Sequence, residues 1–169
     1  MTKLNFCQGT IQDKHLLAMT QFYHSNKLPK NIPITTPFTF PILEDKFVLA
    51  KDKNNWWNPL GGHLEKDETW RKALVREAYE EGGVLITAIK LFGYIKVETK
   101  INTSISLYPP VSLMPFTFSK VKKYENNWQA METSERKILT CKQASRLLKL
   151  RGDNDQMLEI FRYLLNIIV

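Results

Sequence analysis

The sequence predicts an α/β domain in which helices cover both faces of a mixed β-sheet, an α/β/α sandwich. Its 169 residues suit one domain with one core. Strand-like and helix-like segments alternate along the chain, and no internal repeat or low-complexity segment interrupts them. Hydrophobic residues make up 43% and charged residues 24%, which is the composition of an ordinary soluble globular protein.

The first segment of the chain is predicted to be helical. Residues recur at helical spacing at Ile11, His15, Ala18, Met19 and Phe22. The proline-containing stretch KLPKNIPITTP then ends the pattern. We therefore expect residues 1–30 to form a helical extension packed on a main domain of residues 31–169. The sequence leaves the oligomeric state open, and a homodimer in which this extension lies at the contact is one option.

The main domain should begin with two strands, because FTFPILEDKFVLAKD alternates around a turn at Glu44-Asp45. Thr69 is a suitable N-cap for a helix that runs to about Glu81 and is closed by Gly82-Gly83. Further strands are expected at KLFGYIKVET, around SLMPFTFSKV and at RKIL. A small helix, CKQASRLLKL, should follow the cap residue Thr140, and an amphipathic helix should end the chain.

The helix after Thr69 carries an unusual group of acids. At about 100° per residue, Glu77, Glu80 and Glu81 share one face. The adjoining face, with Leu74, Val75 and Ala78, is expected to pack on the sheet. Like charges at this spacing destabilise a helix. Either exposure to water or a divalent cation would relieve the repulsion, because hard ions such as Mg²⁺ prefer carboxylate oxygens.

The residues around the acids favour the cation. Gly61 and Gly62 allow the backbone before the helix to approach a ligand closely. Arg76 can reach back to Glu68 or along the helix to Glu80 and so orient these carboxylates.

This stretch resembles the Nudix box: Gly, five residues, Glu, seven residues, Arg-Glu, an aliphatic residue, any residue, Glu-Glu, any residue, Gly and an aliphatic residue. The specified places are filled by Gly62, Glu68, Arg76, Glu77, Ala78, Glu80, Glu81, Gly83 and Val84. Two features depart from the usual pattern. Pro59 stands one place early before the two glycines, and Ala78 is small for an aliphatic position. The resemblance implies a Nudix-like sandwich fold.

The resemblance also implies a metal-dependent hydrolase that cleaves a pyrophosphate bond in a nucleoside diphosphate linked to another group. In that reading, one to three Mg²⁺ or Mn²⁺ ions are held by the residues Glu77, Glu80, Glu81 and the Gly61 carbonyl. Glu68 and Arg76 support them. The general base is Glu80 within the helix, or an acid outside it. Glu132 and Glu135 are the preferred outside candidates, ahead of Glu98 and Glu125.

The substrate is predicted only by class. One ring of the Trp56-Trp57 pair should pack inward, and the other is placed to stack on a nucleobase. His63, beside Gly62, is a candidate phosphate contact. The features that mark the ADP-ribose and dinucleoside polyphosphate groups do not occur at their usual spacing. We therefore expect a small nucleotide, such as a (d)NTP or a nucleotide sugar.

Charge supports an alternative substrate. The net charge is +7, and most of the excess lies between Lys120 and Arg151, where nine basic residues outnumber three acidic ones. Such a stretch is either a solvated surface or a binding surface for a polyanion. The alternative is therefore removal of pyrophosphate from an RNA 5′ end. A regulatory module that binds a nucleotide without cleaving it is a third reading.

The sequence indicates a cytoplasmic protein without a membrane span. No signal peptide and no run of about eighteen apolar residues is found. Cys7 and Cys141 form no Cys-x-x-Cys pair, which argues against a disulfide framework and a thiolate metal site.

Overall fold

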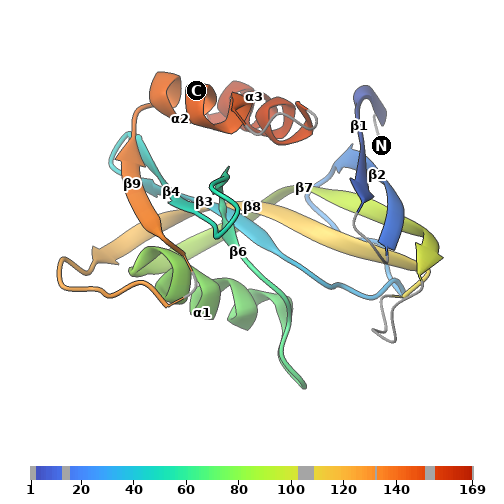
Figure 1. Cartoon of the computed structure of the whole chain (residues 1–169), viewed down its shortest axis with the longest axis horizontal. Coiled ribbons are helices and arrows are strands. Elements are labelled where there is room, and N and C mark those ends of the chain that lie inside the picture. Colours follow the sequence, from blue (N-terminus) through green and yellow to red (C-terminus); the bar gives the residue numbers. More distant parts are fainter. Residues whose placement is uncertain (1–2, 13–15, 103–108, 132, 151–154, 169) are drawn as a thin grey trace.

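The computed structural model of the chain describes residues 3–12, 16–102, 109–131, 133–150 and 155–168 (Figure 1). Strands and helices follow one another in the order β1 (Lys3–Gln12), β2 (Leu16–His24), β3 (Phe38–Leu43), β4 (Lys46–Lys51), β5 (Trp57–Asn58), β6 (Leu60–Gly61), α1 (Trp70–Gly82), β7 (Val84–Asn102), β8 (Val111–Tyr124), β9 (Glu135–Leu139), α2 (Cys141–Lys149) and α3 (Gln156–Ile168). The elements predicted after residue 37 are all present.

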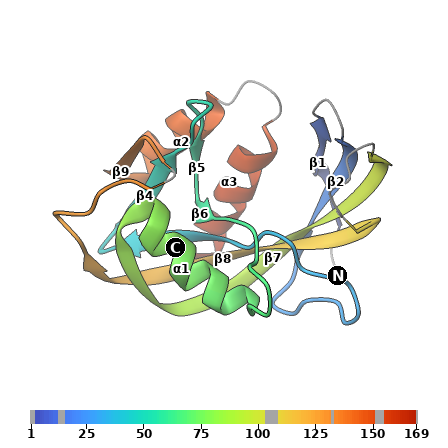
Figure 2. The same ribbon diagram turned by 60° about the horizontal axis from the view of Figure 1, so that its bottom comes forward.

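The strands form one mixed sheet between two helical layers. Its order is β1-β2-β7-β8-β3-β4-β5, while β6 pairs with β3 and β9 pairs with β4. Strands β3 and β8 are parallel, with Phe38 opposite Phe116, and the other pairs are antiparallel. Helix α1 covers one face, and α2 and α3 lie across the other (Figures 1 and 2). The predicted sandwich with a mixed sheet is confirmed.

The prediction of an N-terminal helix was wrong. Leu16–His24 is strand β2, which pairs with β7 from Leu16 opposite Asn102 to His24 opposite Gly93. The residues of this segment have helical spacing in the sequence, but their burial alternates with a period of two residues. Ala18, Thr20 and Phe22 are buried, whereas Met19 is 52% exposed. Pairing with β7 decides between the two patterns, because it satisfies the backbone and buries one face at the same time.

Each helical layer has its own apolar core. On one side, Phe161 of α3 packs edge to face on Phe47 with ring centroids 4.8 Å apart, and it lies 5.2 Å from Phe40. On the other side, Leu74 and Ala78 of α1 are fully buried against the sheet. The burial of these side chains anchors α1 to the sheet, at roughly 25 cal/mol per Å² of apolar surface removed from water.

Helix α1 begins and ends as predicted. The Thr69 side chain accepts a hydrogen bond from the Lys72 N–H, and Gly83 closes the helix in the left-handed conformation, with φ of 58°. One prediction for its buried face was wrong, because Val75 is 41% exposed. The helix meets the sheet through Leu74 and Ala78, four residues apart, and this turns Val75 outward and brings Glu77 inward.

The two later helices complete the second layer. Thr140 caps α2 in a capping box with Gln143, as its position predicted. Helix α3 buries Leu158, Phe161 and Leu164. None of the helices among the described residues combines the length and hydrophobicity that a bilayer-spanning segment needs.

Candidate active site

Arg76 is the centre of the acidic group on α1. Its Nε and Nη2 atoms donate to the two oxygens of Glu68 at 3.1 and 2.9 Å. Its Nη1 atom donates to Glu77 Oε1 at 2.8 Å and to Glu80 Oε2 at 2.9 Å. Nη2 also donates to the His63 carbonyl oxygen at 3.0 Å. One planar guanidinium therefore orients three carboxylates and the loop that precedes the helix.

These charges are largely withdrawn from water. The exposed fractions of the side chains are 8% for Glu77, 13% for Glu68, 22% for Arg76 and 27% for Glu80. Hydrogen bonding to Arg76 lowers the pKa of Glu68. The same bond, with those to Glu77 and Glu80, raises the pKa of Arg76 above its usual range. Both groups are therefore held in their charged forms.

The two glycines before the helix lie directly against its acids. The Gly61 N–H donates to Glu81 Oε2 at 2.8 Å. A Cβ atom on Gly62 would lie 2.3 Å from Glu77 Oε1, inside any permitted contact distance. Strand β6 places this backbone, because Gly61 pairs with Phe38 of β3. The carboxylates of Glu77 and Glu81 thus adjoin the same short stretch of main chain.

Replacing Gly62 with alanine is expected to lower kcat about 10-fold or more, because the new methyl group forces the Glu77 carboxylate aside. Turnover and thermal unfolding should be measured together. The matched control is the same substitution in a Glu77→Gln background, where the additional loss should be much smaller. Normal turnover in a folded Gly62→Ala variant would contradict this packing argument.

Three of the acids, Glu68, Glu77 and Glu80, converge on Arg76. Among the described residues, no three His, Cys, Asp or Glu side chains are gathered closely enough to hold a metal ion as they stand. The reason is visible in the contacts, since Glu77 and Glu80 share Arg76 Nη1 while Glu81 binds the Gly61 N–H. A cation at this site would require the side chains of these glutamates to turn.

The candidate substrate residues lie in different surroundings. Trp57 is buried in the core at 6% exposure, and the Lys137 ammonium lies 4.9 Å from its ring. Trp56 is half-buried and is the more exposed residue of the pair. His63 is exposed, and its carbonyl is bound by Arg76. The base-stacking and phosphate-contact roles stay predictions.

Asp52 organises the turn that presents Trp56, and the sequence analysis missed it. Its Oδ1 atom accepts from the N–H groups of Asn54 and Trp56 at 2.8 and 2.9 Å. Its Oδ2 atom accepts from Asn58 Nδ2 at 3.0 Å. The signal was present in the stretch DKNN, because aspartate followed by asparagines favours a turn closed by its own side chain.

Two of the candidates for the general base, Glu132 and Glu135, do not lie on α1. Glu132 lies outside the described residues. Glu135 begins β9 and pairs with Lys137 at 2.8 Å, with 43% of its side chain exposed. Its neighbour Thr133 donates from Oγ1 to the Glu81 carbonyl at 2.9 Å. The β8–β9 connection, described at residues 125–131 and 133–134, therefore contacts the acidic end of α1 through Thr133. The identity of the base stays a prediction.

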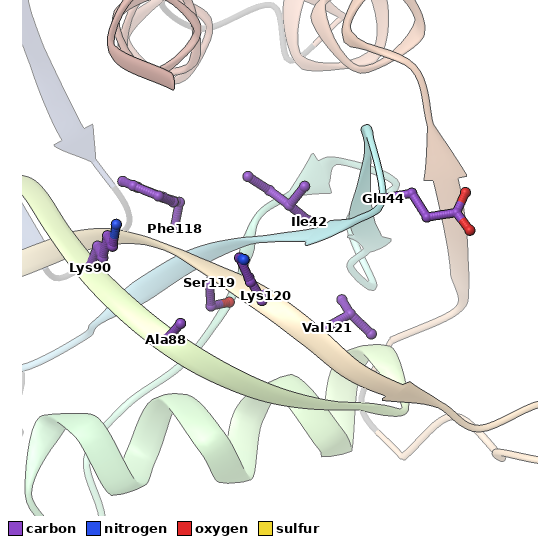
Figure 3. Close-up of a pocket in the computed structure, with 8 residues that line it drawn as sticks. All are labelled: Ile42, Glu44, Ala88, Lys90, Phe118, Ser119, Lys120 and Val121. Atoms are coloured by element: carbon purple, nitrogen blue, oxygen red, sulfur yellow. The ribbon is translucent and has the colours of Figure 1, made fainter. Parts of the chain in front are cut away.

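A separate cavity of about 280 Å³ lies at the other end of β3 (Figure 3). Its lining residues come from β3, β7, β8 and the β3–β4 turn: Ile42, Glu44, Ala88, Lys90, Phe118, Ser119, Lys120 and Val121. Ile42 lies near the end of β3, opposite Lys120, whereas Gly61 pairs with Phe38 at its start. None of the box acids lines this cavity, so it is not the site that they form.

A match to a protein-family profile identifies the family to which the chain belongs. The profile of the NUDIX domain matches residues 36–161. The chain belongs to the NUDIX family. This confirms the family predicted from the box and, with it, the class of enzyme, a Nudix-type hydrolase of pyrophosphate bonds. The matched region of the NUDIX chain contains Arg76, the box acids and both glycines.

Solved structures share the fold of this NUDIX chain at low sequence identity. The pyrophosphohydrolase BsRppH of Bacillus subtilis has a TM-score of 0.66 at 17% identity, over 94% of this chain and 96% of that one. A NUDIX hydrolase from Nitrosomonas europaea has a TM-score of 0.57 at 17% identity, over 79% and 90%. An Ap4A hydrolase from C. elegans has a TM-score of 0.53 at 15% identity, over 78% and 95%. No curated protein sequence matches the chain significantly.

Proposed function

We propose that this NUDIX chain hydrolyses the pyrophosphate bond of a small nucleotide, such as a (d)NTP or a nucleotide sugar. The observation that carries the proposal is the set of box acids held around Arg76 and against Gly61 and Gly62. A protein that only binds a nucleotide has no need of several partly buried carboxylates, because their repulsion and desolvation oppose folding.

The chemistry of the donor set fits a divalent cation, although the glutamate side chains must turn to bind it together. One guanidinium faces the carboxylates of Glu68, Glu77 and Glu80, so the acids outnumber this cation three to one. Carboxylate oxygens are the side-chain ligands that Mg²⁺ and Mn²⁺ prefer. Glu77, Glu80 and Glu81 would hold the ion beside the Gly61 backbone. When bound there, it would offset the charge of phosphate oxygens and acidify a water molecule.

The chain's own residues contribute positioning. Arg76 orients Glu77 and Glu80 through hydrogen bonds of 2.8 and 2.9 Å. The Gly61 N–H holds Glu81 at the opposite side of the acidic face. Glu80, Glu132 or Glu135 would accept a proton from the attacking water. Trp56 would stack on the base, since it is the more exposed residue of the pair.

The second candidate is an RNA 5′ end, and the exposed basic residues favour it. Lys120 and Lys122 are exposed on β8, and Lys142, Arg146 and Lys149 are exposed on α2. Two members of the predicted basic stretch do not add to this surface as described: Arg136 is enclosed by Tyr124 and Trp128, and Arg151 lies outside the described residues. The named relatives include a pyrophosphohydrolase and an Ap4A hydrolase, which supports the bond type but leaves the substrate open.

The deciding experiment is a phosphate-release screen with Mg²⁺ or Mn²⁺ over nucleoside triphosphates, nucleotide sugars, dinucleotides and triphosphorylated RNA. We expect metal-dependent turnover that is fastest on a small nucleotide. Faster turnover on RNA, with binding that weakens steeply as salt rises, would favour the second candidate. If none of these substrates is cleaved with the metal present, the result would favour a regulatory module that binds a nucleotide without cleaving it.

A further inference from the structure

Arg136 extends from β9 to the C-terminal end of α1 and is enclosed there. Its guanidinium lies 4.0 Å from the ring centre of Tyr124 and 4.6 Å from that of Trp128. It donates to the carbonyl oxygens of Gly82, the last residue of α1, and of Glu125. Two aromatic faces and two carbonyl groups therefore hold one cation.

Gly83 makes this close approach possible. A Cβ atom at Gly83 would lie 2.3 Å from Arg136 Nη1 and 2.4 Å from Trp128 Cγ. The same residue has a φ of 58°, and its carbonyl accepts from the Glu125 N–H at 2.9 Å. The glycine that ends the helix thus also joins the guanidinium to the β8–β9 connection.

Arg136 supplies a positive charge that the last turn of α1 lacks. The last turn of a helix presents unpaired carbonyls and a partial negative charge, and α1 has no basic residue of its own in that turn. Arg136 supplies the missing positive charge from a distant strand. Thr133 binds the Glu81 carbonyl at 2.9 Å, so the final carbonyls of α1 are bound by side chains of the segment that includes the β8–β9 connection and β9.

We propose that Arg136 is a positioning residue, which fixes the last turn of α1 and the β8–β9 connection relative to Gly61. Glu80 and Glu81 lie in that turn, so a shift of its end changes where their carboxylates stand. Misplacement of about 1 Å at a reacting centre can reduce the rate about 100-fold. The proposal rests on the proposed function of the box acids, and it removes Arg136 from the residues that would bind a polyanion.

The test compares Arg136→Met, which removes the charge and the hydrogen bonds, with Arg136→Lys, which keeps the charge but loses the planar guanidinium that reaches both carbonyl groups. Arg162→Met is the control, because it makes the same chemical change at an exposed residue of α3. Four quantities are measured: kcat, KM, the affinity for Mn²⁺ without substrate by calorimetry, and hydrogen exchange of the Gly83 and Glu125 amides, both of which are hydrogen-bonded here.

Arg136→Met should lower kcat about 10-fold or more and weaken Mn²⁺ binding several-fold, with KM changed less than about 3-fold. Exchange at the two amides should accelerate. Arg136→Lys should recover part of kcat, and Arg162→Met should match the wild type within about 2-fold.

Faster amide exchange with unchanged kcat and Mn²⁺ affinity would overturn the proposal, because Arg136 would then only stabilise the fold. If Arg136→Met does not fold, Arg136→Lys and Trp128→Leu decide by the same measurements. If the wild type cleaves none of the tested substrates, the proposed function fails separately. Mn²⁺ affinity and amide exchange then still report whether Arg136 positions the acids.

Discussion

Replacing Glu81 with glutamine should lower kcat by a factor of about 10² or more while the chain stays folded. The Glu81 carboxylate accepts from the Gly61 N–H at 2.8 Å, and a glutamine oxygen can accept the same bond. Shape and backbone contact are therefore kept, and the negative charge alone is lost. Because the proposed divalent cation would depend on that charge, the loss should appear in turnover and in the metal concentration needed for activity.

Glu159→Gln is the matched control for this substitution. It removes one carboxylate charge from α3, where Glu159 pairs with Arg162 on the surface, and it should leave kcat nearly unchanged. Turnover and circular dichroism of both variants should be compared at several Mg²⁺ concentrations. A folded Glu81→Gln variant with near-normal turnover would rule out Glu81 as a metal ligand.

Replacing Arg76 with methionine is expected to reduce both stability and activity. The substitution leaves Glu68, Glu77 and Glu80 without the cation that they share, and Glu77 is only 8% exposed. Removing one partner from a buried ion pair costs about 3–5 kcal/mol, and we expect the lower end because Arg76 itself is 22% exposed. Chemical denaturation at neutral pH measures the loss.

The stability difference between wild type and Arg76→Met should depend on pH. Hydrogen bonding to Arg76 lowers the pKa of Glu68 in the folded state. A lowered folded-state pKa contributes stability above the unfolded value, and the contribution disappears as the pH falls through the folded-state pKa. The difference in the free energy of unfolding should therefore have its largest value at neutral pH. It should become smaller below about pH 4, where glutamate becomes protonated.

Arg71→Met provides the control for this pH dependence. Arg71 lies on the same helix, over the Trp70 ring at 4.4 Å, and it donates to the Ile89 carbonyl instead of a carboxylate. Its effect on the free energy of unfolding should be small and nearly independent of pH. A difference for Arg76→Met that stays constant from pH 7 to pH 3 would show that its ion pair with Glu68 contributes little to stability.

Local chemistry made much of the main domain predictable. Thr69 and Gly83 mark the ends of α1, and Thr140 marks the start of α2, because each satisfies backbone groups that a helix leaves unpaired. The spacing of Glu68 and Arg76 likewise predicted a contact that the structure contains. Such features depend on neighbours within one or two turns and can be read from a single sequence.

Features that depend on distant partners were not predictable in this way. Leu16–His24 has two apolar periodicities, and only its pairing with β7, some eighty residues away, selects the strand. Arg136 stood among other basic residues, and nothing in its local sequence indicated that it would reach Gly82. The orientation of Val75 was also wrong, because it depends on which side of α1 meets the sheet.

The pairing of β2 with β7 has a consequence for choosing a shorter version of the protein. The NUDIX match starts at residue 36, so a fragment trimmed to it would lack β2. Such a fragment would leave the long β7 with a free row of amide and carbonyl groups, and it would uncover the aromatic rings that Phe22 shields. Bare strand edges of this kind recruit other chains. The shortest fragment that stays folded and does not aggregate should therefore include β2 in addition to the residues that match the NUDIX profile.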